Sequence, residues 1–462
     1  MTNQEETMKN IISLAKRRGF IYPGSDIYGG LAGTYDYGPL GVTLKKNIEN
    51  LWWKMHVDLR EDMYGLDSAI LMNPKVWEAS GHVGGFNDPL VSDLKTKKRY
   101  RADHLLEEAG LDPTGLSLSE MGELIIKHNL KSPEGNQLSE PQQFNMMFKT
   151  TVGSIDGADT TVYLRPETAQ GMFVNFKNII DSFHPLLPFG IAQIGRAFRN
   201  EIAPRDFIFR VRELEIMELE YFVHEDDWLG LFEYWLERSR IWFRALGFEP
   251  GDIKEVEIPD GERAHYSKRT VDFHFRYPHK FDEIGGLAYR TDYDLKSHIE
   301  SSSVDLSYHD AINNKRFVPH VIEPTYGVGR HVLAVLTKAY TVDKLGEDDR
   351  VFLKLPVHLA PIKVAVFPLL KNKPDLVAKA EEVYNLLKKD VPQIMWDDNG
   401  NIGKRYRRQD EIGTPYCLTI DFDTLVDKTV TVRDRDTGLQ TRASLEEFIA
   451  QLKTAIDHYQ TL

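Results

Sequence analysis

A change of pattern at residues 354–361 divides this chain into two parts. Prolines at positions 356 and 361 interrupt regular structure there, because proline has no backbone N–H to donate. After this break, short apolar runs alternate with amphipathic stretches, which indicates an α/β domain with a mixed sheet. We expect strands over 363–367, 393–396, 416–421 and 429–434 and helices over 374–389, 402–411 and 445–459.

The larger first part combines helical and strand signals with an interruption. Apolar spacing predicts helices over 5–18, 42–63, 228–246 and 330–340, and strands over 66–71, 189–194 and 207–222. Between 87 and 154, polar turns bracket two short helical patterns near 102–109 and 119–128. We interpret this segment as a subdomain inserted into the first domain, which gives domains at 1–356 and 357–462.

The composition, with 42% hydrophobic and 27% charged residues, is typical of a globular protein and argues against disorder. No apolar run approaches the ~18 residues of a membrane-spanning helix, and residues 1–22 are too polar for a signal peptide, so we expect a cytoplasmic protein. A single cysteine, Cys417, excludes an intrachain disulfide. The net charge of −13 argues against wholesale capture of nucleic acid, although local basic clusters leave a limited nucleic-acid face open.

A charged run around Phe198-Arg199-Asn200-Glu201 carries the first chemical signal and continues into the strand expected over 207–222. Alternate residues of a strand share a face, so four charged residues are expected on one side: Arg210, Arg212, Glu218 and Glu220. Guanidinium groups suit phosphate oxygens, and carboxylates suit an ammonium group. This face is therefore predicted to hold a triphosphate beside an amine-bearing substrate; a solvated strand face with cross-strand ion pairs is the alternative.

The second signal runs from Glu323 to Arg330 and leads into an apolar helix. Gly327 and Gly329 allow the backbone to approach a ligand closely, and Arg330 stands at the start of the helix. In isolation this pattern is typical of an ordinary strand-to-helix turn.

Together the two runs resemble the second and third signature motifs of class II aminoacyl-tRNA synthetases, and Pro74 fits the first motif. Four further segments are similar to the dimeric, single-polypeptide family of glycyl-tRNA synthetases: 80–82, 165–171, 187–190 and 290–295. The matches extend from about Phe20 to the C-terminus, mainly interrupted in the insertion. The resemblance implies an α+β fold with an antiparallel class II sheet flanked by helices, an inserted subdomain and a C-terminal α/β anticodon-binding domain.

The resemblance also implies a homodimeric enzyme that activates glycine with ATP and transfers it to the 3′ end of tRNA(Gly). The amino-acid carboxylate attacks the α-phosphate directly, so catalysis needs positioning and charge neutralisation and no nucleophilic side chain. In the family, the arginine matching Arg199 binds the α-phosphate and the one matching Arg330 binds the distal phosphates; these are the candidate catalytic residues. Glu201 is expected beside the adenine amino group, and Glu283 is the candidate ligand for Mg²⁺.

Further positions carry over from the family in two sets. The positions matching its ATP contacts are Arg199, Asn200, Glu201, Phe209, Arg210, Val211, Arg212, Glu213, Leu214, Glu283, Ile284, Gly327, Val328, Gly329 and Arg330. The positions matching its glycine contacts are Arg99, Glu167, Leu214, Glu215, Ile216, Met217, Glu218, Glu323, Pro324, Thr325, Tyr326 and Gly327.

The chain departs from the family pattern in two places. Thr325 stands where members usually carry serine, which adds a methyl group to a pocket that must exclude every side chain larger than hydrogen. Members often carry cysteine pairs near the segments 93–97 and 132–135, where this chain has none. We therefore expect no zinc site in the insertion.

The C-terminal domain carries the argument for tRNA. Four positive charges accompany Tyr406, a combination that suits single-stranded RNA by phosphate pairing and base stacking: Lys404, Arg405, Arg407 and Arg408. A solvated helix face is the alternative for this charge run. For the whole chain, two rivals stay open: a non-catalytic synthetase-like protein that binds nucleic acid, and the same chemistry with another small amino acid such as alanine or serine.

Overall fold

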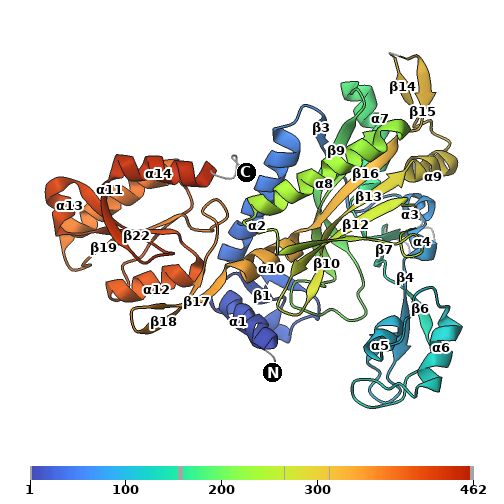
Figure 1. Ribbon diagram of the computed structural model, residues 1–462, viewed down its shortest axis with the longest axis horizontal. Helices are drawn as coiled ribbons and strands as arrows, with labels where there is room; N and C mark the ends of the chain where they lie inside the picture. Colours follow the sequence, from blue (N-terminus) through green and yellow to red (C-terminus); the bar gives the residue numbers. More distant parts are fainter. Residues whose placement is uncertain (1–2, 154–159, 265, 312, 458–462) are drawn as a thin grey trace.

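The computed structural model describes residues 3–153, 160–264, 266–311 and 313–457, which form two bodies joined near residue 354 (Figure 1). The expected end of the insertion at residue 154 and the expected end of the last helix at 459 lie outside the described residues, as do the outermost limits of the two domains. None of the described helices is both long and apolar enough to cross a membrane.

A seven-stranded sheet forms the first body. Neighbouring strands are antiparallel, except that β3 and β9 are parallel. The order is β11 (Ile253–Glu257), β12 (Arg269–Arg276), β13 (Phe281–Thr291), β16 (His320–Gly327), β10 (Glu213–Val223), β9 (Phe189–Phe198) and β3 (Met63–Gly65). The predicted antiparallel sheet flanked by helices is confirmed.

The two faces of this sheet are covered by different helices. Leu219 and Tyr221 of β10 enter the main core, which α8 (Trp228–Ala245) and α10 (Val328–Ala339) help to form. Phe222 packs instead in the core that contains α7 (Ala169–Phe183). Because successive strand residues point to opposite faces, Glu218 and Glu220 share the α7 face with Phe222.

Two expectations in the N-terminal region are wrong in extent. The first helix is α1 (Asn3–Arg17), but the helix expected over 42–63 is α2 (Pro39–Trp53) followed by a π-helix (Lys54–Asp58). The strand expected over 66–71 is also misplaced, since β3 ends at Gly65. After Leu66, whose N–H still donates to Ala192 of β9, the Arg165 side chain binds this backbone, with Nη1 donating to the Ser68 carbonyl at 2.8 Å.

The strand expected over 207–222 begins only at Glu213. Asp206 and Phe207 adopt left-handed backbone angles, with φ of 58° and 60°, and an isolated bridge between Arg205 and Arg210 closes the turn. The expectation that Arg210 and Arg212 share a strand face with Glu218 and Glu220 is therefore wrong. The arginines lie on a loop, and only the two glutamates lie on the strand.

The predicted insertion forms a small body of its own, at the lower right of Figure 1. A three-stranded sheet, β5 (Arg99–Arg101), β4 (Asn87–Ser92) and β6 (Gln142–Asn145), carries α5 (Ala102–Glu108) and α6 (Leu118–Lys127). Leu106 and Met121 from these helices share one apolar cluster. Both predicted helices are confirmed.

Two turns of this insertion meet around the carboxylate of Asp93, which is fully buried. Ser132 Oγ donates to it at 2.6 Å and Asn136 Nδ2 at 3.0 Å, and the backbone N–H groups of Lys95 and Thr96 donate at 2.8 Å. Burial raises the pKa of Asp93, but these hydrogen bonds outweigh it and hold the pKa well below its usual range. Hydrogen bonds therefore join the two turns at the place where the sequence lacks cysteine pairs.

The second body is the predicted α/β domain with a mixed sheet, and the predicted fold class is confirmed. Its strand order is β20 (Ile394–Trp396), β19 (Val364–Pro368), β21 (Tyr416–Ile420), β22 (Thr429–Asp434) and β23 (Gln440–Ser444). The first three are parallel and the rest antiparallel. Its helices are α11 (Pro374–Asp390), α12 (Ile402–Ile412), α13 (Phe422–Asp427) and α14 (Leu445–Asp457); β23 and α13 were not predicted.

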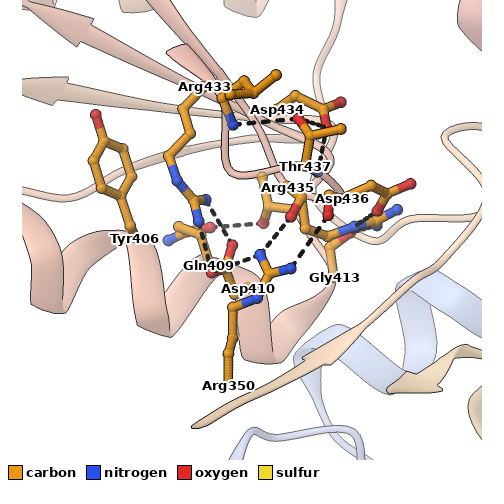
Figure 2. Close-up of polar contacts among 12 residues, drawn as sticks. Arg350, Tyr406, Gln409, Asp410, Gly413, Arg433, Asp434, Arg435, Asp436 and Thr437 are labelled. Atoms are coloured by element: carbon orange, nitrogen blue, oxygen red, sulfur yellow. Dashed lines mark hydrogen bonds and ion pairs between the residues drawn. The ribbon is translucent and has the colours of Figure 1, made fainter. Parts of the chain in front are cut away.

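A hairpin of β17 (Tyr340–Leu345) and β18 (Asp348–Leu353) follows α10 and meets the second body (Figure 2). Arg350 of β18 donates to the carbonyl oxygen of Arg435 at 2.6 Å and lies 3.6 Å from the carboxylate of Asp410 on α12. Arg433 donates to both oxygens of Asp410, at 2.7 and 2.9 Å. This buried ionic cluster, which we call the junction cluster, connects the two bodies.

Candidate active site

A pocket opens where the loop before β10 meets the start of α10. It is lined by Tyr35, Tyr37, Lys45, Arg196, Arg199, Glu201, Ile208, Phe209, Arg210, Val211, Glu213, Leu214, Glu215, Gly327, Gly329 and Arg330. The two sequence signals, far apart in the chain, therefore converge on one cationic pocket.

The two candidate phosphate-binding arginines are held by different contacts. Arg199 Nε donates to the Pro166 carbonyl at 3.1 Å. Arg330 Nη1 lies 3.0 Å from the carboxylate of Glu283, and its guanidinium stacks 4.6 Å from the Phe209 ring centre. Burial raises the pKa of Glu283, but Arg330 outweighs it and the net pKa is lowered. Both arginines line the pocket.

Five residues expected to contact ATP do not line the pocket: Asn200, Arg212, Glu283, Ile284 and Val328. Ile284 and Val328 are fully buried in the main core. Arg212 donates to the carbonyl oxygens of Ala32, at 2.6 Å, and Glu201, at 3.0 Å. Arg212 thus fastens the glycine-rich loop before β2 (Tyr35–Tyr37) to the loop that lines the pocket.

Part of the pocket wall was not predicted from the sequence. Tyr35 and Tyr37 of β2 and Lys45 of α2 line it, and Lys45 forms an ion pair with Glu215. Burial raises the pKa of Tyr37, so its hydroxyl stays protonated. The dense run of tyrosines and glycines over 24–41 was the available signal for this wall.

A second, acidic site lies on the α7 face of the sheet, and we call it the acidic cluster: Glu167, Glu218, Glu220, Glu323, Asp294 and Arg290. Arg290 is 1% exposed and donates to Asp294 and to Glu323 at 2.8 Å each. Its guanidinium also stacks 3.9 Å from the ring centre of Tyr266. Arg290 is the central cation of this cluster, although it was not among the expected site residues.

Glu218 and Glu167 are each held by donors. The Thr168 backbone N–H donates to Glu218 at 2.9 Å, and its hydroxyl donates to the same oxygen. Thr325 Oγ1 donates to the other oxygen of Glu218 at 3.4 Å. Glu167 accepts from Gln170 at 3.0 Å and lies 3.4 Å from His82, which was not among the expected site residues.

Crowding of carboxylates shifts their proton affinities. Burial raises the pKa of Glu323 to about 7, although Arg290 opposes the shift. Burial and Glu323 raise the pKa of Glu220 well above its ordinary value. Burial also raises the pKa of Glu167, but His82 and Arg290 outweigh it and leave the net value well below the usual range. The cluster therefore combines ionised and protonated carboxyl groups.

The run expected to bind glycine, Leu214 to Glu218, is divided between the two sites. Leu214 and Glu215 line the cationic pocket, and Met217 is fully buried in the main core. Glu218 belongs to the acidic cluster, where it accepts hydrogen bonds from Thr168 and Thr325. Arg99 lies exposed on β5 of the insertion, so the structure does not place it inside the acidic cluster.

The basic run on α12 is mostly engaged within its own domain. Arg405 is buried and donates to the carbonyls of Pro368 at 2.5 Å and Asp398 at 2.9 Å. Tyr406 is also buried, with its hydroxyl 2.7 Å from Thr419. The expectation that Arg405 and Tyr406 contact RNA is wrong, because this face of α12 packs on the sheet.

The other charges of this run differ in exposure. Lys404 is exposed. Arg407 is half-buried and donates to the Asp349 carbonyl at 3.0 Å. Arg408 is half-buried and donates to Asp397 at 2.8 Å.

Comparison with known proteins agrees with this division into two bodies. A family model described as a class II tRNA synthetase core domain (G, H, P, S and T) matches residues 148–339, and one described as an anticodon binding domain matches residues 363–455. A glycine–tRNA ligase from Bacillus anthracis is 47% identical over 458 residues, which cover 97% of this chain and 99% of the relative.

Relatives from other genera match equally broadly. A glycine–tRNA ligase from Alkaliphilus oremlandii is 47% identical over 459 residues, 97% of this chain and 98% of the relative. A glycine–tRNA ligase from Clostridium tetani is 46% identical over 463 residues, which cover 98% of this chain and 99% of the relative. These similarities extend through both bodies and the insertion.

Proposed function

This chain belongs to the family of glycine–tRNA ligases, and on that premise we propose how its residues divide the reaction. The cationic pocket binds ATP and the acidic cluster binds the ammonium group of glycine. Arg199 lies between them, because it lines the pocket and is also close to Glu218 of the cluster. Burial and Glu167 raise the pKa of Glu218, and the charge of Arg199 opposes this rise. This adjacency of a triphosphate site and an ammonium site is the observation that carries the proposal.

In the activation step, the glycine carboxylate attacks the α-phosphorus of ATP, and pyrophosphate leaves. Arg199 neutralises charge at the α-phosphate, and Arg330 holds the distal phosphates. Preoriented cations of this kind stabilise the transition state without a nucleophilic side chain. The adenylate then passes its glycyl group to a terminal hydroxyl of tRNA(Gly), and AMP leaves.

Mg²⁺ fits the carboxylate of Glu283, which pairs with Arg330 of the pocket. Asp272 on β12 is near enough to Glu283 on β13 to be influenced by its charge: burial, together with Glu283, raises the pKa of Asp272 to about 7. Mg²⁺ is usually bound through one or two carboxylates together with substrate phosphates, and no group of three or more metal-ligating side chains occurs among the described residues. Glu283, with Asp272, would hold the ion, which supplies charge neutralisation for the leaving pyrophosphate.

Selection of glycine depends on exclusion. Glu167, Glu218 and Glu323 bind the ammonium group, and the hydroxyl of Thr325 orients Glu218. The Thr325 methyl group fills space beyond the glycine Cα, so a larger amino acid is rejected by steric conflict.

The remaining assignments are also proposals. Residues 1–356 form the catalytic domain, residues 87–154 its inserted subdomain and residues 357–462 the anticodon-binding domain. Within the basic run, Lys404 contacts tRNA, with Arg407 and Arg408 at its side. The active protein is a cytoplasmic homodimer, and its insertion needs no zinc.

ATP–pyrophosphate exchange tests the proposal. Purified protein with Mg²⁺ is supplied with glycine, alanine or serine in turn, without tRNA. We expect exchange with glycine alone, and a loss of at least about 100-fold for Arg199→Ala, because one preoriented transition-state donor is worth about 10²–10³ in rate. Arg316→Ala is the matched control, since Arg316 is exposed and pairs with Asp305 at 3.3 Å.

Each outcome has a distinct meaning. Exchange with alanine or serine would change the substrate assignment. If no amino acid supported exchange and the same preparation charged no tRNA(Gly), the catalytic proposal would be wrong, and a role in nucleic-acid binding would replace it.

A further inference from the structure

Glu220 is the one member of the acidic cluster without a hydrogen-bonding partner. Its side chain is 0% exposed, and neither carboxylate oxygen has a donor among the described residues. Glu218 and Glu323, by contrast, accept hydrogen bonds from Thr168 and from Arg290. A fully buried carboxylate without a donor is strongly disfavoured as an ion.

The strand register places Glu220 next to another acid. β10 and β16 pair Glu218 with Thr325 and Tyr221 with Ile322, which sets Glu220 opposite Glu323. Side chains at directly opposed positions have Cβ atoms about 4.5–5.5 Å apart, and like charges there repel. One oxygen of Glu323 is occupied by Arg290, so the other is open to a donor from Glu220.

The surrounding charges do not neutralise this pair. Arg290 is the only arginine or lysine in the acidic cluster, and its guanidinium also serves Asp294. The titratable groups that face the pair or its immediate neighbours come from several elements. β10 contributes Glu218, β13 contributes Arg290, and α9 (Tyr293–Ser302) contributes Asp294 and His298. Tyr266 lies beside Arg290, His82 from α4 (His82–Gly85) lies beside Glu167, and the cations Arg165 and Arg199 face Glu218. Burial lowers the pKa of His298, so this histidine adds no charge at neutral pH.

We propose that Glu220 and Glu323 share one proton in the empty site, and that the ammonium group of the incoming amino acid expels this proton to solvent. This inference rests on the proposed function and adds a positioning residue to it. Glu220 in its acid form donates to Glu323 and keeps that carboxylate in place. When the ammonium enters, its positive charge replaces the proton, so the charge of the site changes little and no other reactant is needed.

The arrangement has a defined pH signature. Below the apparent pKa of the pair, the ammonium must displace a proton, so KM for glycine rises up to tenfold for each unit by which pH falls. Above it, the pair is already ionised and KM is constant. The glycine ammonium itself remains protonated through this range, so its own titration does not interfere.

Glu220→Gln isolates the proposed role. Glutamine keeps the shape and can still donate to Glu323, but it has no proton to release. In the exchange assay we expect the KM of this variant for glycine to equal that of the wild type near pH 6 and to exceed it about 5- to 10-fold near pH 8.5. The KM of the variant should therefore depend little on pH, and its kcat should differ from that of the wild type by less than about twofold. Glu257→Gln on exposed β11 is the matched control.

Calorimetry on the wild type supplies a readout that needs no variant. A glycyl-sulfamoyl analogue of the adenylate, which carries the free ammonium group, is titrated near pH 6.5 in two buffers of different ionisation enthalpy. We expect release of close to one proton per site, and clearly less for Glu220→Gln.

Three results would overturn the inference: no proton release by the wild type, equal release by Glu220→Gln, or a KM raised by the same factor at every pH. The last result would show a purely structural role. If the wild type supports exchange with glycine but shows none of these pH effects, only this inference fails. If no exchange occurs at all, the proposed function itself fails.

Discussion

The acidic cluster and the junction cluster are both buried groups of arginine and carboxylate side chains, yet their charges are arranged in opposite ways. In the junction cluster, Arg433 and Arg350 flank one carboxylate, Asp410 (Figure 2). Arg350 uses its other donors on Asp343 and on backbone carbonyls. In the acidic cluster, one guanidinium, that of Arg290, serves two carboxylates, Asp294 and Glu323.

This difference shows which of the two clusters has its buried charges paired within the chain. Buried charges are tolerated when they are paired and their remaining donors and acceptors are satisfied. The junction cluster meets this condition within the chain, which is what a structural contact between two bodies requires. The acidic cluster has an excess of negative charge and an unpartnered carboxyl group, which is typical of a site that receives a cation.

Removal of Arg290, the single cation at the centre of the acidic cluster, should show the difference between the two clusters most clearly. In Arg290→Met, Asp294 and Glu323 lose their partner, and breaking a buried ion pair costs about 3–5 kcal/mol. We expect exchange with glycine to fall at least 10²-fold. Lower pH should partly restore the folded fraction, because protonation of the carboxyl groups replaces the lost charge.

Arg290→Lys is the companion variant, since it keeps the charge but not the paired hydrogen bonds to Asp294. We expect an intermediate loss. Denaturation curves between pH 5 and 8 measure stability, and exchange measures activity. Equal stability of Arg290→Met and the wild type across this range would show that the cluster tolerates its own negative charge.

Asp410→Asn removes the central anion of the junction cluster. Arg433 then lies buried without a carboxylate, whereas Arg350 keeps Asp343, and we expect the free energy of unfolding to fall by about 3–5 kcal/mol. Urea denaturation measures this change, with Asp423→Asn as the control because that side chain is 80% exposed.

The functional effect of Asp410→Asn should be selective. Glycine-dependent exchange in the folded protein should stay within about twofold of the wild type, since Asp410 lies outside the pocket, whereas charging of tRNA should fall further. An equal loss of both activities would mean that the junction cluster also shapes the active site.

Asp93 of the insertion is another buried carboxylate. Like Asp410 in the junction cluster it has all the hydrogen bonds it needs, but its donors are neutral groups and not arginines. Its pKa is lowered in the folded insertion, so its contribution to stability is present above its unfolded pKa of about 3.9. That contribution is lost as pH falls through the folded value. We expect Asp93→Asn to speed proteolysis between residues 87 and 153 at neutral pH.

Glycine-dependent exchange by Asp93→Asn should remain unchanged, with Asp112→Asn as a control on the same subdomain. An effect of a zinc chelator on wild-type proteolysis would contradict the interpretation that hydrogen bonds alone hold these two turns. Acidification should reproduce the effect of the substitution in the wild type.

The sequence predicted the elements of the α/β domain well because each has a clear hydrophobic period and turn residues at its ends, as in α11 and β19. It also identified Arg199 and Arg330 at the pocket, because local motifs carry them. It misplaced Arg210 and Arg212, since the left-handed turn at Asp206 and Phe207 lacks glycine and leaves no mark in the pattern.

Other features depend on contacts between distant residues. Lys45 reaches the pocket from α2 to pair with Glu215, and Arg290 becomes central only when β13, β16 and α9 come together. The charge run around Tyr406 and Arg405 predicts a solvent-exposed position, but these two side chains lie on the face of the helix that packs into the domain. Periodicity gives the faces of an element and not the partner that each face meets.

Thr325→Ser is expected to have the smallest effect, and it tests how closely the acidic cluster fits its cation. The hydroxyl that donates to Glu218 at 3.4 Å is kept, so KM for glycine should change less than about threefold. Loss of the methyl group opens space worth about 1 kcal/mol in a pocket of this kind, so kcat/KM for alanine in exchange should rise by about 3- to 10-fold while glycine stays preferred. Thr341→Ser on the β17 hairpin is the matched control. If alanine gained nothing, the Thr325 methyl group would not border the space beyond Cα, and exclusion would rest on the crowded carboxylates alone.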